Sequence, residues 1–360
     1  STTNVVKVRR DSDDSEQDFT ASDIIDGTLL SFVNADVEKI VNGDFATDTD
    51  WTKGTGWSIS GGTANCDGTQ TSNSEFKTTV GIAVQGIQVT FSFEVKNYSA
   101  GTLNATLEGT GTLDFSGINA NGVYSTTATS SDPLPKVTFT ASSDFIGSID
   151  DVSVIQSAAN GLVTTWYDQS GNTNNAIQAT AANQPKIVSS GTLVTENGKA
   201  ALDFDGTDDY FDISNFTGVP TISQFNVLTP SSTSVDETFT SIQNATTTDG
   251  IFLGQGNLST QAKFGLRNYQ AADIADSGIA MTLQQYLLSG ITTSTTAQIY
   301  ANGVAGAISA KARGQTGGDS QIGASGTGGN NFSGKFQELI IFESDQSANR
   351  TGIEANINDY

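Results

Sequence analysis

The chain has 360 residues, of which 39 are acidic and 16 are basic, so its formal charge is −23. A field of this sign repels phosphate backbones and no apolar run is long enough to cross a bilayer, so neither nucleic-acid binding nor membrane insertion is expected. Histidine is absent and Cys66 is the single cysteine, which excludes an intrachain disulfide, a zinc cluster, and Ser-His-Asp or Cys-His catalysis.

Small and β-branched polar residues dominate the rest of the composition. Glycine occurs 38 times and proline five times, and Thr, Ser and Asn are abundant. Such a mixture favours many short strands joined by tight turns over long helices. The length is enough for two domains of ordinary size. The chain is therefore expected to be all-β, with few short helices.

The first elements can be predicted from local patterns. Residues 5–10 alternate in polarity, which predicts a strand, and an acidic, polar turn follows at 11–18. Residues 26–33 are expected to form a short helix with Asp26 or Thr28 near its N-cap.

A block from about residue 34 to residue 160 has its own pattern. It opens on Asn-Gly-Asp-Phe at 42–45 and closes on Ile-Asp-Asp-Val at 149–152. The segment 87–95 is apolar at every second position, as a half-buried strand requires.

Three strands are predicted after this block. The first ends in Trp-Tyr-Asp-Gln-Ser-Gly-Asn at 166–172, which forms a polar turn, and the others lie at 184–188 and 201–210. The last of these contains Asp-Gly-Thr-Asp-Asp, a combination of good turn formers.

The C-terminal part predicts a hairpin, a long strand and a helix. Strands are expected at 285–291 and 297–303, and Asn-Gly at the end of the second supplies the positive φ angles of a tight turn. Residues 332–342 are expected to form a final strand, and 347–358 a closing helix capped near Ser344 or Asp345.

This order of pieces resembles the laminin-G/concanavalin-A-like sandwich. The most similar version is the catalytic sandwich of the fungal α-L-arabinofuranosidase B family and its relatives in phage and marine bacterial surface proteins. The middle block resembles a carbohydrate-binding jelly roll of the kind associated with xylanases and glucanases. The resemblance implies neighbouring first and last strands in the jelly roll, which is what permits insertion into a host loop.

The expected fold is therefore two β-sandwiches. A discontinuous laminin-G/concanavalin-A-like host is assigned to residues 1–36 plus 158–360, and an inserted jelly roll to residues 37–157. Since this host fold serves both sugar-binding modules and glycosidases, the sites have to decide the function.

Four aromatic residues are candidates for stacking on a sugar ring: Trp51, Tyr98, Tyr124 and Tyr167. The alternative is packing in the core, since large aromatic side chains dominate the cores of small sandwiches. Trp51 has polar neighbours in the sequence, which favours exposure.

Carboxylates provide candidate calcium ligands. The resemblance to a jelly-roll module implies an ion that ties the first strand to the last, and Asp44, Asp150 and Asp151 occupy suitable segments. A structural Ca²⁺ is the only cofactor considered. The acidic group at 203–209 is explained more simply as a turn.

Catalysis would have to use two carboxyls, as in glycosidases. Glu338 paired with an Asp of the 203–209 turn is the one assignment available on the host strands. The arabinofuranosidase family's own nucleophile and acid have no matching motif here, and a vicinal disulfide is impossible with one cysteine. No catalytic residue is therefore assigned, and a non-enzymatic protein is expected.

The leading hypothesis is a phage structural protein of the tail-fibre, head-fibre or decoration type, located at a virion surface or outside the cell. Its expected partners are cell-surface polysaccharide or other virion proteins, and a homo-oligomer is expected. The alternatives are a glycoside hydrolase of arabinofuranosidase type, and a subunit of an extracellular filament in which an unpaired edge strand pairs with a neighbour.

Overall fold

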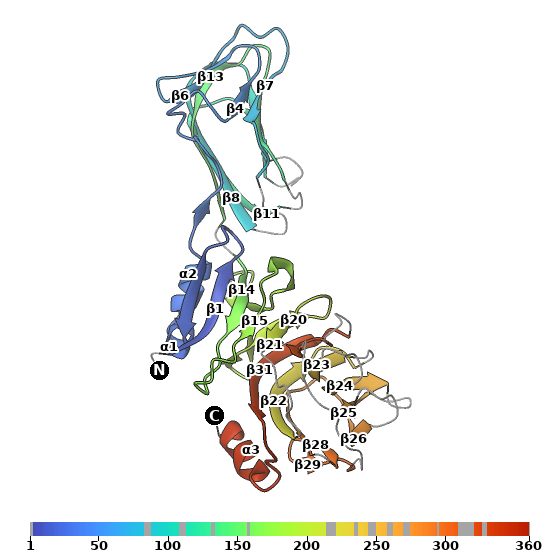
Figure 1. Cartoon of the computed structure of the whole chain (residues 1–360). Helices are drawn as coiled ribbons and strands as arrows, with labels where there is room; N and C mark the ends of the chain where they lie inside the picture. The colour runs from blue at the N-terminus through green and yellow to red at the C-terminus, as the bar shows by residue number, and fades with distance from the viewer. Residues whose placement is uncertain are drawn as a thin grey trace. The chain divides into compact units, whose positions relative to one another are not determined.

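A computed structural model of the chain describes residues 3–82, 88–107, 113–130, 134–156, 159–213, 221–233, 237–243, 250–257, 262–268, 274–293, 295–308, 320–325 and 330–359. The chain divides into two compact units: unit 1 is Ser1–Leu30 with Asn160–Tyr360, and unit 2 is Ser31–Ala159. The boundary expected at 157–158 lies outside the described residues. Antiparallel strands build both units, which confirms the all-β prediction (Figure 1).

Unit 2 consists of two antiparallel sheets. One has the order β10-β9-β12-β7-β4, and the other has the order β11-β8-β13-β6-β5, with β3 paired to β13. The strands are β3 (Val37–Glu38), β4 (Trp51–Lys53), β5 (Trp57–Ser60), β6 (Thr63–Asp67), β7 (Ser74–Thr78), β8 (Gln88–Ala100), β9 (Leu103–Leu107), β10 (Asp114–Ile118), β11 (Gly122–Thr129), β12 (Val137–Ala141) and β13 (Ile146–Gln156). Because β3 pairs with the end of β13, the chain enters and leaves unit 2 side by side.

Alternation along β8 accounts for the core of unit 2. Val89, Phe91, Phe93 and Val95 are at most 1% exposed, whereas the residues between them are not buried. Successive strand side chains point to opposite faces, so one face of β8 enters the core.

Trp51 belongs to this core. Its side chain is only 5% exposed, its ring stacks on Phe76 with centroids 4.8 Å apart, and its Nε1 donates to the Asn42 carbonyl at 3.1 Å. The prediction that Trp51 is an exposed sugar-stacking platform is therefore wrong. The polar residues Thr52 and Lys53 that follow it in β4 are exposed, whereas Trp51 in the same strand is buried.

Unit 1 contains the remaining strands. They are β1 (Asn4–Arg10), β2 (Glu16–Thr20), β14 (Gly161–Trp166), β15 (Ala176–Ile177), β16 (Lys186–Ser189), β17 (Thr192–Leu193), β18 (Thr195–Glu196), β19 (Lys199–Ala200), β20 (Leu202–Asp205), β21 (Phe211–Ile213), β22 (Ile222–Pro230), β23 (Glu237–Gln243), β24 (Gly250–Asn257), β25 (Ala262–Asn268), β26 (Ile274–Ala280), β27 (Tyr286–Thr292), β28 (Ala297–Ala301), β29 (Val304–Ala305), β30 (Ser320–Ile322) and β31 (Ser333–Phe342).

The strand network of unit 1 forms two runs that meet at β14. The start of β14 pairs with β16, which leads through β20, β31, β22 and β27 to β28. The end of β14 pairs with β15, which leads through β21, β30, β23, β24 and β25 to β26. Phe204 of the first run contacts Phe211 of the second, and a buried hydrogen bond of 2.6 Å joins Thr240 to Gln224. The two runs therefore face each other, as the layers of a sandwich do.

Helices are short in the described part of the chain. They are α1 (Ala21–Ile25), α2 (Thr28–Val33) and α3 (Arg350–Asn358), together with a 3₁₀ turn at Ala181–Asn183. The helix expected at 26–33 begins at Thr28, whose N–H and hydroxyl bond to Asp26. The closing helix begins at Arg350 rather than near 347. None of these helices has the length and apolar character that a membrane span needs.

Strand β31 departs from regular pairing. Its register with β22 shifts between Glu338, opposite Val227, and Phe336, opposite Leu228, so Gln337 is an extra residue, a β-bulge. On the other edge, β20 pairs with β31 only as far as Phe336. From Gln337 onward, this edge of β31 has no strand partner among the described residues.

We expect Trp51→Ala to lower the free energy of unfolding of unit 2 by about 3–5 kcal/mol, because it removes a buried indole and leaves a cavity. Scanning calorimetry of the full chain would report this as a lower transition temperature for unit 2 alone. As a control, Val123→Ser alters a side chain that is 74% exposed and should change stability by less than about 0.5 kcal/mol. Equal effects of the two variants would contradict the burial of Trp51.

Candidate functional site

A pocket of about 1230 Å³ in unit 1 is the candidate site. Residues Phe336 to Glu343 of β31 and its C-terminal end form one wall. The lining also includes Trp166 at the end of β14, residues 167–170 of the turn that follows, and Val5 and Val6 of β1. The pocket lies beside the part of β31 that follows Phe336, where β31 has no strand partner on its β20 edge among the described residues.

The hairpin β18–β19 borders the pocket, and Gln337 holds it in place. Asn197 and Gly198 have φ angles of 47° and 78°, the left-handed values that a tight hairpin turn requires. The Gln337 amide donates to the carbonyls of Glu196, at 3.1 Å, and Lys199, at 3.3 Å. The side chain of Gln337 thus contacts β18 and β19 just after the point where the backbone pairing of β31 with β20 ends.

Polar amides from three segments meet at this border. The Gln285 side chain donates to Gln337 and accepts a hydrogen bond of 2.6 Å from the side chain of Asn197. Asn302, at positive φ in the Asn-Gly turn after β28, also lines the pocket. Amide groups both donate and accept hydrogen bonds, so this border can bind hydroxyl-rich ligands.

Tyr167 is the one predicted aromatic candidate that lines the pocket. It follows β14, and its backbone N–H donates to the Val5 carbonyl at 2.9 Å. Its hydroxyl donates to Asp18 at 2.7 Å. Burial, and then the hydrogen bond to the Asp18 carboxylate, raise the pKa of Tyr167 to about 12. Its ring is therefore held in one position and remains neutral at physiological pH.

Asp168 lines the pocket but shapes its own turn. Its carboxylate accepts hydrogen bonds from the N–H and hydroxyl of Ser170, both at 2.8 Å, and from the N–H of Asn174 at 3.0 Å. Partial burial works to raise the pKa of Asp168, but these hydrogen bonds outweigh it and lower that pKa overall. A carboxylate satisfied in this way is poorly suited to act as a general acid.

Glu338 is different, because its carboxyl has no hydrogen bond or ion pair among the described residues. It lines the pocket on the face of β31 that it shares with Ile340, and its cross-strand neighbour is Val227. Val227 and Ile340 pack against the apolar cluster of Phe225, Leu287 and Ile357. Burial raises the pKa of Glu338.

The acid pair considered for a glycosidase is only partly tested by the strand register. None of the aspartates at 203–209 lines the pocket. Asp205 lies opposite Ser333, five residues along β31 from Glu338, which is roughly 16 Å at the rise of a strand. Asp203 lies opposite Lys335, three residues from Glu338, which is roughly 10 Å. Glycosidase carboxyls lie about 5–9.5 Å apart. The register therefore disfavours Asp205 as the partner of Glu338, and pairing with Asp203 stays a prediction.

Tyr98 and Tyr124 pack against the core of unit 2. The Tyr124 ring stacks on Phe93 at 5.5 Å, and its hydroxyl donates to the Ala120 carbonyl. The Tyr98 hydroxyl donates to the Gly101 carbonyl, and its ring contacts Phe145. Both rings are half-buried and use a face or edge for packing, which leaves less of the ring for a sugar.

The calcium ligands expected in unit 2 do not form a three-carboxylate cluster. Asp150 forms an ion pair with Lys96 at 2.8 Å and accepts from the N–H of Asp151, whereas Asp44 is exposed and accepts from the N–H of Ala46. The three residues are therefore not brought together as a set of acidic ligands. Calcium binding by two of them with backbone carbonyls stays a prediction.

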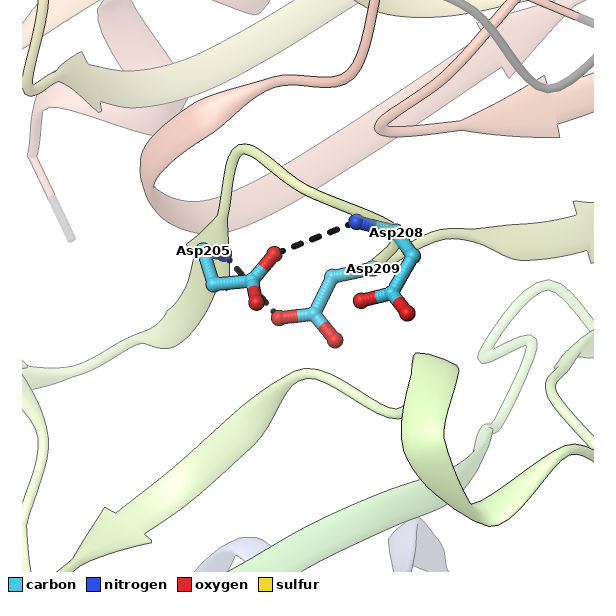
Figure 2. Close-up of side chains that lie close together, drawn as sticks. All are labelled: Asp205, Asp208 and Asp209. Carbon is cyan, nitrogen blue, oxygen red and sulfur yellow. Dashed lines mark hydrogen bonds between the residues drawn. The ribbon is translucent and has the colours of Figure 1, made fainter.

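Three other carboxylates do meet. Side-chain oxygens of Asp205, Asp208 and Asp209 lie within 4.8 Å of one another in the turn after β20 (Figure 2). Asp205 accepts from the N–H groups of Thr207 and Asp208, and its own N–H donates to Asp209 at 3.0 Å. These bonds are those of a compact acidic turn, as the sequence indicated.

Sequence reasoning missed the amide border of the pocket. Asn197-Gly198 was a recognisable turn signal between two short strands, and it would have located the hairpin. The bulge at Gln337 carries no such signal, because its position follows from where β20 ends.

No protein-family model and no curated protein matches the sequence. Among solved structures, the chain is similar to domain 4 of AbnA, a GH43 extracellular arabinanase from Geobacillus stearothermophilus, in complex with arabinotriose. The identity is 13%, over 45% of this chain and 79% of that chain, with a TM-score of 0.34.

Two further similarities cover more of this chain. One is to a GH54 α-L-arabinofuranosidase, at 14% identity over 75% of this chain and 62% of that chain, with a TM-score of 0.44. The other is to domains LG4-5 of the mouse laminin α1 chain, at 13% identity over 84% and 93%, with a TM-score of 0.32. An arabinofuranosidase and laminin domains are the kinds of protein that the sequence motifs resemble. Since all three TM-scores are below 0.5, the sandwich architecture rests on the strand pairings of this chain.

Asp209 predicts a pH-dependent stability. Burial, and then the charge of Asp205, raise the pKa of Asp209 from 3.8 to about 7. A raised carboxyl pKa contributes stability below pH 4 that is lost as the pH rises to 7, because the folded state must then accommodate a buried charge. We expect Asp209→Asn to gain on the order of 1–3 kcal/mol relative to the wild type over this interval.

Urea titrations of both proteins at several pH values, in the presence of a chelator, would measure this difference. Asp208→Asn is the matched control, since Asp208 is only half-buried. Stability curves of wild type and Asp209→Asn that stay parallel from pH 4 to 7 would contradict the shifted pKa.

Proposed function

We propose that this chain is a non-enzymatic protein exposed at a surface, of the tail-fibre, head-fibre or decoration type, and that its β31 pocket binds a cell-surface glycan. The observation that carries the proposal is the combination of a fixed tyrosine ring, a border of amide side chains and a partly apolar wall in one open pocket. Amides match sugar hydroxyls, and an aromatic face matches the C–H face of a sugar ring.

Weak sites of this kind are effective when they are repeated. A pocket open to solvent in which one aromatic ring, that of Tyr167, is the proposed stacking surface supplies modest affinity for one glycan chain. Several copies displayed together on a particle would raise the overall avidity without any new contact. This requirement fits the homo-oligomer expected from the sequence.

A glycan array with the protein displayed multivalently tests the proposal. We expect Tyr167→Ala to weaken binding about two- to tenfold, whereas Tyr167→Phe retains the ring and most of the binding. Tyr124→Phe, which keeps the ring stacked in the core of unit 2, is the control and should leave binding unchanged. Absence of binding to any glycan would contradict the proposal.

The hydrolase alternative has no assigned acid pair in the pocket, because Asp168 is hydrogen-bonded within its own turn and Glu196 forms an ion pair with Lys335. We therefore expect no release of reducing sugar from arabinan or related polysaccharides above the level without protein. Glu338→Gln should give the same background, as measured with a reducing-end assay. Sugar release that disappears in Glu338→Gln would instead favour a glycoside hydrolase.

A second candidate function is supported by one observation, the unpaired edge of β31. The N–H and C=O groups of such an edge can accept a strand from another polypeptide. The chain would then be a subunit of an assembly or filament held together by strand pairing. The side chains of Leu339, Ile340 and Ile341 would flank the added strand.

Light scattering after size exclusion separates these two functions. If the edge of β31 forms the assembly, Ile340→Pro should dissociate it, because proline removes a backbone donor and disfavours continued pairing. If the pocket serves a glycan alone, the oligomeric state will not depend on Ile340. Circular dichroism of the variant controls for a loss of fold.

A further inference from the structure

We propose that the β31 pocket selects glycans that carry a free amino group, with the carboxylate of Glu338 as the counter-ion of the ammonium. This inference rests on the proposed function, and it names the class of glycan. It follows from the surroundings of Glu338 and from the charges along the pocket wall.

Glu338 is a half-buried acid without a partner. Its carboxyl lines the pocket, no hydrogen bond or ion pair to it exists among the described residues, and its neighbours Val227 and Ile340 are apolar. Removing a carboxylate from water without compensation costs free energy, and a bound cation with N–H donors repays that cost. The carboxylate of Glu338 therefore favours the binding of a positively charged group in this pocket.

The other acids that line the pocket are unavailable for this role. Asp168 is saturated by its own turn, and Glu196 forms an ion pair of 3.0 Å with Lys335. Glu343 is exposed to solvent. Among the described pocket residues, Glu338 is therefore the carboxyl that a ligand can contact with the largest gain.

The overall charge of the pocket points the same way. Its lining contains four carboxylates, Asp168, Glu196, Glu338 and Glu343, and one ammonium, Lys199. Such a wall repels uronic acids, sialic acids and sulfated sugars, whereas it attracts amino sugars. The amides of Gln285 and Gln337 lie beside Glu338 and can bind the hydroxyl groups next to the amine.

Calorimetric titration with short glucosamine oligomers, compared with N-acetylglucosamine oligomers of the same length, tests this inference. We expect the amino form to bind more tightly to the wild type. Glu338→Gln should weaken binding of the amino form about tenfold and leave the acetylated form within about twofold, because only the amino form makes the charge-assisted contact.

Glu343→Gln is the matched control. It removes the same charge from the same pocket wall, so it reports what general attraction by an acidic protein contributes. That attraction is screened at an exposed position, and we expect a change below about twofold. Binding of the amino form should also weaken as the pH falls and Glu338 becomes protonated in the free pocket.

Four outcomes would overturn the inference. Equal affinity for the two oligomers, or equal effects of Glu338→Gln and Glu343→Gln, would leave glycan binding intact and remove the role of Glu338. Binding to neutral glycans on the array without binding to glucosamine oligomers would do the same. No binding to any glycan would contradict the proposed function as well.

Discussion

The shortness of β20 is the constraint on which the candidate site depends. This strand has four residues, whereas β31 has ten, so the backbone ladder between them ends at Phe336. Beyond that point β31 is paired on one edge alone among the described residues, and this part of β31 lines the pocket. The bulge at Gln337 lies at this transition, where its amide contacts β18 and β19 in place of a ladder hydrogen bond.

Local patterns predicted most of the strands, because the alternation of apolar and polar residues within a strand reflects which of its side chains are buried. Alternation along 87–95 corresponds to β8, and the Asn-Gly signal at 302–303 corresponds to the turn after β28. Patterns of this kind cannot predict a bulge. Strict alternation would continue the pairing of β31 with β22 past Phe336 without a shift, but Gln337 is an extra residue and Glu338 lies opposite Val227. The position of a bulge depends on where the neighbouring strands end.

The aromatic candidates show that the neighbours of a residue in sequence do not predict whether its side chain is available to bind a ligand. Trp51 has polar neighbours in sequence, yet its ring is held between Phe45 and Phe76. A small sandwich has few large side chains, and their burial contributes more free energy than a weak contact to a sugar. Tyr167 differs because it lies in the turn after β14, lines the pocket and is held through its hydroxyl by Asp18 of β2. Its location in the fold, rather than its neighbours in sequence, makes it a candidate.

The positions of the buried acids bear on whether the pocket could hydrolyse a glycan. Hydrolysis needs two carboxyls that share one substrate and have different pKa values. In unit 1, burial raises the pKa values of Asp203, Asp209, Glu237 and Glu338. Asp209 lies in the acidic turn after β20, whereas Glu338 lies on β31 in the lining of the pocket. At the turn, backbone N–H groups satisfy part of the charge. The carboxyl of Glu338 has no hydrogen bond or ion pair among the described residues, so a ligand that donates hydrogen bonds to it would offset the cost of its burial.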